Sequence, residues 1–503
     1  MGKDLVLVNP GGRVGVYQSL GNDLTAIEPP LWCRLIAGYA RDRGYDVTII
    51  DSEGENLCPE SVTHRIRALE PTLVVIVVFG HQPSASTQMM VGAGDVCRAI
   101  KALTPEQPLL IVGGHVSALP ERSLREEAVD FVCKGEGPVT VVQLLEALRG
   151  RKRNGELDEE APGLEAVQGL VWRNGGEIVC NPVAPLIGDL DADLHGQVWD
   201  MLPMDRYRAH NWQCFGALHT RMPYASIYTS LGCPYKCSFC CIHAPFDSNR
   251  YRMRKPEAVV AEIDHLYRAY GVRTFKIVDE MFVLNERHVA AICEGIIGLG
   301  YSAELNIWAY SRIDTVKPRM LEMLRKAGIR WLALGIESGS KHVRDGSDKH
   351  LRYDDIIAIV RQIQQADISV IGNFIFGLPD DTMETMRETL DLAKELNCEF
   401  ANFYSAMAYP GSALYQKAVD QGWALPEAWS GFSQHSHDCQ PLPTETLPAA
   451  QILGFRDAAF HEYFATPRYL EMVTQRFGWE TRRHIEEMAA HRLRRKFLEG
   501  AAQ

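Results

Sequence analysis

Short apolar runs alternate with amphipathic stretches over the first 148 residues. The runs are rich in β-branched residues and lack polar alternation, which is typical of strands buried on both faces of a parallel sheet. Strands are expected at Leu5–Val8, Val47–Ile50, Leu73–Val78, Leu109–Val112 and Phe131–Val132, and helices at 31–43, 60–69, 87–102, 121–127 and 138–148. Five such units predict a doubly wound, flavodoxin-like α/β sheet over residues 1–148.

A second alternation follows a connector at 149–222. Residues 149–165 are charged and contain Gly and Pro, as linkers do, and 169–182 contain the turn residues of a β-hairpin. Strands are expected at 225–230, 273–278, 304–309, 331–335, 369–376 and 400–406, and crossover helices at 256–269, 286–298, 317–327, 352–365 and 381–396. A complete barrel needs eight units. Residues 223–425 therefore predict a partial (β/α)6 barrel, and 426–503 a small helical C-terminal cap.

Composition narrows the class of protein without deciding it. The 503 residues are 46% hydrophobic and 23% charged, which is ordinary for a globular protein. A net charge of −12 argues against a nucleic-acid partner, and the basic run Arg492–Lys496 is interpreted as a solvated helix face rather than a lipid or RNA contact. No apolar stretch is long enough to span a membrane, and no signal sequence is recognisable, so the prediction is cytoplasmic.

Four of the thirteen cysteines lie within 233–241, in the stretch LGCPYKCSFCCIHAPF. Cys233, Cys237 and Cys240 are spaced C-x3-C-x2-C on a loop between the first strand of the second unit and the next helix. Three thiolates turned toward one point suit an iron–sulfur cubane that keeps one iron open. The alternatives are zinc, bound by Cys237 and Cys240 with His243 and either Cys233 or Cys241, and buried free thiols. The residues alone indicate a three-thiolate cluster on a barrel loop.

This loop resembles the signature of the radical SAM superfamily, with Phe239 in its aromatic position. The resemblance covers about 222–425. It implies a [4Fe-4S] cluster on the three cysteines and S-adenosylmethionine (SAM) on the open iron. Reductive cleavage then gives a 5′-deoxyadenosyl radical, with an electron donor such as flavodoxin or ferredoxin.

Acidic and basic residues stand where the predicted barrel strands end, which is where barrel sites are built. Asp279 and Glu280 follow the second strand, Arg312 the third and Glu337 the fourth. By resemblance, the acids contact the SAM ammonium or ribose, and Arg312 binds its carboxylate. Helix capping, solvated acids or a surface ion pair are the structural alternatives. FIFGLPDD (374–381) and AYPGSALY (408–415) resemble the fifth and sixth strand motifs, although plain turns would look similar.

Three loops of the first domain are rich in small residues at the carboxyl ends of its strands, where doubly wound sheets bind ligands. They are FGHQPSASTQ, GGHVSALPE and KGEGP. The domain resembles the cobalamin-binding domain of one large radical SAM class. The resemblance implies cobalamin contacts from Ser84, Ser86, Gly113, Gly114, His115, Gly135, Glu136 and Gly137. Turn capping and turn geometry are the alternatives for these serines and glycines. NPGGRVG (9–15) departs from G-x-G-x-x-G, which weakens a nicotinamide interpretation.

The D-x-H-x-x-G motif of cobalamin-dependent mutases, whose histidine is the lower cobalt ligand, is absent. His81 is the candidate to replace it, because imidazole can ligate cobalt. In the cap, 432–464 are rich in His and aromatic residues. His435, His437 and Asp438 are candidate substrate contacts, with a structural role as the alternative.

Together these resemblances imply a cobalamin-dependent radical SAM methyltransferase. It would act on an unactivated carbon of a small metabolite or peptide. One rival keeps both cofactors but performs cyclisation, rearrangement or oxidation. Another is a non-catalytic metal-binding or electron-transfer module. The sequence identifies neither the substrate nor a catalytic residue.

Overall fold

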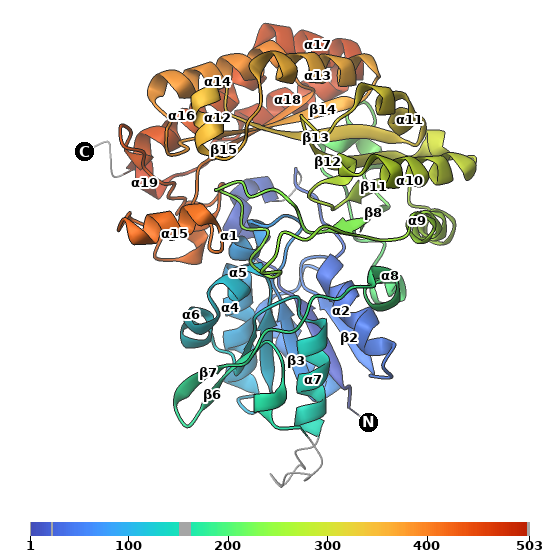
Figure 1. Cartoon of the computed structure of the whole chain (residues 1–503), viewed down its shortest axis with the longest axis vertical. Coiled ribbons are helices and arrows are strands. Elements are labelled where there is room, and N and C mark those ends of the chain that lie inside the picture. Colours follow the sequence, from blue (N-terminus) through green and yellow to red (C-terminus); the bar gives the residue numbers. More distant parts are fainter. Residues whose placement is uncertain (1, 22–23, 150–161, 500–503) are drawn as a thin grey trace.

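The computed structural model describes residues 2–21, 24–149 and 162–499. Two α/β units lie one above the other, and helices near the C-terminus cover the outer side of the second unit (Figure 1). The linker predicted at 149–165 falls mainly on residues 150–161, which lie outside the described residues. The predicted α/β class with two sheets and C-terminal helices is confirmed.

The first sheet has the strand order β2-β1-β3-β4-β5-β6-β7. Its first five strands are parallel, and their interior residues are fully buried because helices cover both faces. The bounds are β1 Leu5–Asn9, β2 Val47–Asp51, β3 Leu73–Val77, β4 Leu109–Val112 and β5 Phe131–Cys133. The order reverses between β1 and β3, so a crevice for a ligand is expected outside the carboxyl ends of these two strands.

Helices cover this sheet on both sides. On one face of the sheet, α2 (Leu31–Arg41) and α7 (Pro138–Arg149) pack against the apolar side chains that β1 and β3 direct toward that face. The opposite face carries α3 (Pro59–Leu69), α4 (Ala85–Leu103) and α6 (Pro120–Glu126). The predicted helices agree with these bounds within about two residues, because each has a clear apolar stripe.

The predicted hairpin at 169–182 forms β6 (Leu170–Asn174) and β7 (Glu177–Cys180). Its first strand pairs antiparallel with β5, so the hairpin extends the first sheet. The sequence placed it in the connector between the domains. Edge pairing depends on the free side of β5, a feature that exists only once the sheet has formed.

The second sheet contains six parallel strands in sequence order, β8-β11-β12-β13-β14-β15. The bounds are β8 Tyr224–Ile227, β11 Thr274–Ile277, β12 Asn306–Arg312, β13 Ile329–Glu337, β14 Ser369–Phe376 and β15 Phe400–Ser405. The crossover helices are α9 Pro256–Tyr270, α10 Glu286–Gly298, α11 Leu321–Lys326, α13 Tyr353–Gln365 and α14 Met383–Leu396. β15 does not pair with β8, so the predicted partial barrel is confirmed as an open one.

The C-terminal helices α16 (Ala449–Phe464), α17 (Pro467–Phe477) and α18 (Trp479–Ala490) lie outside the barrel. Two buried tyrosines anchor them, because the hydroxyls of Tyr463 and Tyr469 donate hydrogen bonds to the backbone carbonyls of Cys398 and Glu399. None of the described helices combines the length and apolar character that crossing a membrane requires.

A buried ion cluster joins the two units. Glu262 on α9 accepts hydrogen bonds from Arg34 on α2 (3.3 Å), from Arg254 (2.5 Å) and from the indole N–H of Trp199 (3.1 Å). The side chains of Glu262, Arg34 and Arg254 are each at most 1% exposed. Arg34 also donates to the backbone carbonyls of Gly196 and Ser226. This network ties α2 of one unit to the barrel of the other.

Candidate active site between the two units

The cysteine loop leaves the barrel directly after β8 and a two-residue strand, β9 (Ser230–Leu231). Gly232 has a φ of +87°, and a Cβ there would lie 2.1 Å from the carbonyl oxygen of Arg250, so the loop requires glycine at its start. The backbone N–H of Cys240 donates to the carbonyl of Cys237 (3.0 Å), forming a tight turn. The predicted ligands Cys233, Cys237 and Cys240 are free and half-buried, whereas Cys241 is buried.

The other polar groups on this loop distinguish the two metal hypotheses. Both ring nitrogens of His243 are engaged, with the carbonyls of Ser248 (3.0 Å) and Tyr235 (2.8 Å), so this histidine is not free to complete a zinc site. Among the described residues, no three His, Cys, Asp or Glu side chains converge where one metal ion would sit.

Arg312, at the end of β12, lies against this loop. Its guanidinium is 3.9 Å from the ring centre of Tyr235, and Nη1 is 3.5 Å from Sγ of Cys237. Asp314 engages the same guanidinium at 2.9 and 3.1 Å. The structure therefore places Arg312 beside the predicted cluster, with an internal carboxylate partner that SAM would share or displace. Its contact with SAM stays a prediction.

Asp279 and Glu280 are neighbours in sequence but have different surroundings. The carboxylate of Asp279 accepts hydrogen bonds from the backbone N–H and hydroxyl of Thr229 and from the hydroxyl of Ser230, at 2.5 to 2.6 Å. It thus fixes the start of the cysteine loop. Glu280 lines a small cavity beside Ser230, and burial raises its pKa to about 8. Glu280 is therefore the better placed of the two to meet a SAM ammonium.

Two further predicted SAM contacts line the large cavity described below. Glu337 ends β13 with a φ of +67° and pairs with the buried ammonium of Lys349. Phe239 is half-buried and packs against Val343, Leu378 and Ala406. Phe239 belongs to the cysteine loop and Glu337 lines the same cavity as this loop, and the roles of both stay predictions.

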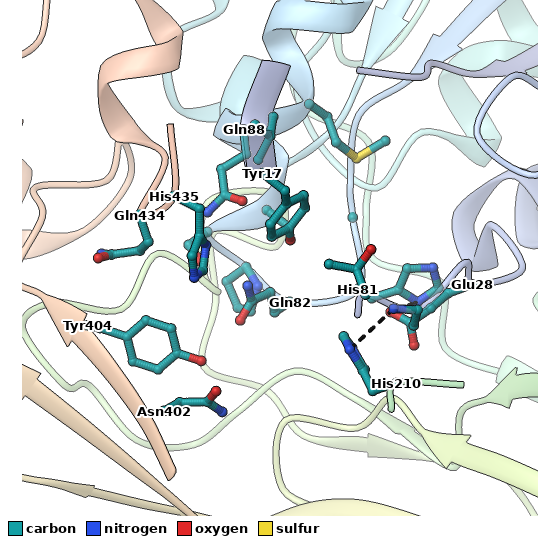
Figure 2. Close-up of a pocket in the computed structure, with 18 of the residues that line it drawn as sticks. Tyr17, Glu28, His81, Gln82, Gln88, His210, Asn402, Tyr404, Gln434 and His435 are labelled. Carbon is teal, nitrogen blue, oxygen red and sulfur yellow. Dashed lines mark hydrogen bonds and ion pairs between the residues drawn. The ribbon is translucent and has the colours of Figure 1, made fainter. Parts of the chain in front are cut away.

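A cavity of about 540 Å³ lies between the carboxyl ends of the two sheets. Its walls include Cys240 of the cysteine loop, the loop Phe79–Ala85 after β3, and inward residues of the barrel such as Tyr310 and Tyr404. Figure 2 shows polar side chains from both units pointing into it. The loop Asn9–Arg13 after β1 also lines the cavity. The sequence interpretation missed this loop, although the reversal of strand order at β1 and β3 would have indicated it.

Only some residues of the first predicted cobalamin loop face this cavity. His81 and Ser84 line it, whereas Ser86 is buried behind it. The Ser86 hydroxyl donates to the carbonyl of Val78 and accepts from the backbone N–H of His115 (2.8 Å). Nδ1 of His81 is buried without a hydrogen-bond partner, 3.8 Å from a carboxylate oxygen of Glu28. Burial lowers the pKa of His81 to about 4, so the imidazole is neutral, as cobalt ligation requires.

The second predicted cobalamin loop packs against the start of α4. A Cβ on Gly113 would lie 2.3 Å from the carbonyl oxygen of Val78, so this glycine allows close strand packing. Gly114 lines only the small cavity. His115 is 1% exposed, with Nδ1 3.1 Å from the Thr87 hydroxyl and Nε2 without a partner.

The third predicted loop is used to join the domains. Gly135 and Gly137 have φ values of +128° and +108°, which glycine adopts easily. The carboxylate of Glu136 pairs with Arg252 (2.6 Å) and accepts from the backbone N–H of Ile187 (2.9 Å). None of these three residues lines the large cavity.

Two facing glycines set the position of the loop after β1. A Cβ on Gly92 of α4 would lie 1.7 Å from the carbonyl oxygen of Gly11. We expect Gly92→Ala to destabilise the protein by about 1–3 kcal/mol and to weaken cobalamin retention, because the loop must move. Urea unfolding and the cobalt content of purified protein measure both effects. Gly15→Ala is the control, since its Cβ would meet nothing closer than 4.0 Å. Equal stability of the two variants would contradict the packing argument.

Comparisons with known proteins agree with this geometry. A family model described as the radical SAM superfamily matches residues 227–393, and one described as the B12 binding domain matches residues 18–145. The "Uncharacterized methyltransferase PH0819" of Pyrococcus horikoshii is 28% identical over 444 residues, or 88% of this chain and 89% of that protein. An anaerobic magnesium-protoporphyrin IX monomethyl ester cyclase of Cereibacter sphaeroides is 28% identical over 83% of this chain and 64% of the cyclase.

The fold also matches a solved structure over nearly its whole length. The radical SAM methyltransferase TsrM from Kitasatospora setae superimposes with a TM-score of 0.69, covering 97% of this chain and 99% of the other, at 18% identity. At this identity the likeness concerns the fold.

The residues present fit the cofactors that the two families imply. Three free thiols supply the donor set of a cubane with one open iron. Cys240 and the predicted cobalamin loop at 79–85 border the same cavity, and His81 offers a buried nitrogen with no partner. Both predicted cofactor sites therefore border one cavity.

Proposed function

We propose that this chain, a radical SAM enzyme with a B12-binding domain, methylates an unactivated carbon of a small metabolite or peptide in the cavity between its two units. Its cofactors are a [4Fe-4S] cluster, SAM and cobalamin. When bound, cobalamin supplies methyl-transfer chemistry, and the cluster with SAM supplies hydrogen-abstraction chemistry. Methylation is supported by relatives named as methyltransferases.

The observation behind this proposal is the single cavity that reaches the cysteine loop, the inner barrel wall and the loops after β1 and β3. A substrate there would meet both cofactors at once. The chain's own residues contribute orientation: Cys233, Cys237 and Cys240 would hold the cluster, and Arg312 and Glu280 would hold SAM. His81 and Ser84 would face cobalamin. The aromatic side chains around the cavity exclude water from the reacting groups.

The proposed division of labour follows the boundaries expected from the sequence. Residues 1–148 would bind cobalamin, 223–425 would bind the cluster and SAM, and 426–503 would close the substrate end. Radical SAM enzymes need a reductant, and we propose flavodoxin or ferredoxin for that role.

The test is an anaerobic incubation of the cofactor-loaded enzyme with dithionite, a small-molecule cell extract and SAM labelled in its methyl group. We expect S-adenosylhomocysteine, 5′-deoxyadenosine and a labelled product. Methylation by this route consumes one SAM as the methyl donor and a second SAM as the source of the radical. Mass spectrometry detects all three. 5′-Deoxyadenosine without S-adenosylhomocysteine or label would contradict methylation.

That second outcome would favour cyclisation, rearrangement or oxidation instead. The relatives named as anaerobic cyclases support this alternative, since they match as much as 90% of this chain. Absence of any SAM cleavage would contradict both reactions and favour a non-catalytic module.

A further inference from the structure

One end of the cavity is built from hydroxyl, amide and imidazole groups and lies opposite the end that holds Glu28, His81 and His210 (Figure 2). Its residues come from elements far apart in sequence. They are Tyr17 and Gln88 of the first unit, Asn402 and Tyr404 of β15, and Gln434 and His435 of the segment after the barrel. None of the side chains labelled at this end in Figure 2 is a carboxylate.

His435 is held there in one orientation and one tautomer. Its backbone carbonyl accepts a hydrogen bond from the side-chain amide of Gln18 (2.7 Å), and its ring packs on Tyr17 with centroids 5.4 Å apart. Nη2 of Arg456 lies 3.4 Å from Nε2 of His435. Because a guanidinium only donates, Nε2 must accept, and the ring proton resides on Nδ1. With its tautomer fixed in this way, His435 offers Nδ1–H as a hydrogen-bond donor.

The charge behind His435 is not balanced. Arg456 and Arg495 are 5% and 3% exposed and share one carboxylate, Asp457, at 2.8 to 2.9 Å. Two guanidinium groups against one carboxylate leave one positive charge. By contrast, the carboxylates that line the cavity are each paired with a cation: Glu28 with Lys276, Glu53 with Arg13, and Glu337 with Lys349.

From this arrangement we propose that the end of the cavity at His435 binds a carboxylate group of the substrate. Nδ1–H of His435 and the hydroxyl of Tyr404 are the donors, and the surplus charge of Arg456 and Arg495 supplies the attraction. One uncompensated charge and two donors match a monoanionic carboxylate rather than a phosphate dianion, which needs more positive charge. This inference rests on the proposed function, since it takes the cavity as the substrate site.

The test compares two probes that differ only in the charged group, indole-3-acetate and indole-3-acetamide. Their flat apolar part suits the aromatic walls formed by Trp308, Tyr310 and Phe460. We expect the cofactor-loaded enzyme to bind the acetate roughly tenfold more tightly in equilibrium dialysis, because a charge-assisted hydrogen bond is stronger than a neutral one.

Two variants locate the preference. His435→Asn keeps a donor near the position of Nδ1 and should retain the preference for acetate. His435→Asp replaces the donor with an anion and should abolish it. His461→Asn is the matched control, because this histidine of α16 lies outside the cavity lining, and it should behave as wild type. Iron and cobalt analysis confirms that each variant is loaded.

Equal binding of the two probes, failure of both to bind, or unchanged acetate binding by His435→Asp would overturn the proposal. So would long-range ¹⁵N–¹H spectra that place the proton of His435 on Nε2. None of these outcomes depends on methyl transfer, so a failure here is distinguishable from a failure of the proposed function. A methylated product lacking a carboxylate would leave methylation standing and remove this inference.

Discussion

Replacing Cys233, Cys237 and Cys240 together by alanine is expected to remove all cluster iron and abolish SAM cleavage while leaving bound cobalamin unchanged. The three thiols are the only free cysteines of the described chain on the loop that leaves β8, apart from the buried Cys241. Loss of three thiolates leaves a cubane without protein ligands. Cobalamin is expected to survive because the loops after β1 and β3 belong to the other unit.

Iron, sulfide and cobalt analysis of anaerobically purified protein measures the first effect, and 5′-deoxyadenosine formation measures the second. The wild type should contain about four irons per chain. Cys241→Ala is the control and should keep its iron, since this thiol is buried beside the loop. Retention of iron in the triple variant, or zinc in the wild type, would contradict the cluster assignment.

The second large effect concerns stability. Glu262→Gln is expected to lower the free energy of unfolding by about 3–5 kcal/mol, because it leaves buried guanidinium groups without their shared anion. Burial lowers the pKa of Arg34 to about 10 even with Glu262 present, which shows how strongly this position disfavours an uncompensated charge. Arg254 retains Asp191 at 3.2 Å, so the loss is expected to fall mainly on Arg34 and on the contact between the two units.

Urea unfolding followed by circular dichroism measures this loss. Glu322→Gln is the matched control, since Glu322 pairs with Lys326 on the surface of α11 with both side chains at least 64% exposed. Such pairs contribute about 0–1 kcal/mol. A similar small change in both variants would mean that the buried cluster does not stabilise the join between the units.

Local patterns in the sequence were enough to predict both sheets and the cysteine loop. Apolar runs and helical periodicity depend on neighbours a few residues away, so strands such as β3 and β14 were recognised without tertiary information. The spacing of Cys233, Cys237 and Cys240 is equally local. Helical crossovers of this length also indicate parallel strands, which both units have, although the order of the strands differs between the two sheets.

Which side chains face the cavity was decided by the tertiary structure. Ser86, Asp279 and Glu136 were predicted to contact cofactors, yet each is engaged by protein groups brought from elsewhere in the chain: His115, Thr229 and Arg252. These partners lie 29 to 116 residues away. No local pattern reveals them.

The cavity and the position of the hairpin both depend on which strands are neighbours in the first sheet. The loop after β1 becomes part of the site only because β1 and β3 are neighbours in the sheet, and β6 joins that sheet because β5 offers a free edge. Arg456 on α16, which folds back against β15, donates to Nε2 of His435 and so keeps the ring proton of this histidine on Nδ1. The sequence by itself determined the elements and the cluster motif, since these depend on short-range spacing. The tertiary structure decided the walls, charges and donors of the site, since these depend on contacts between distant segments.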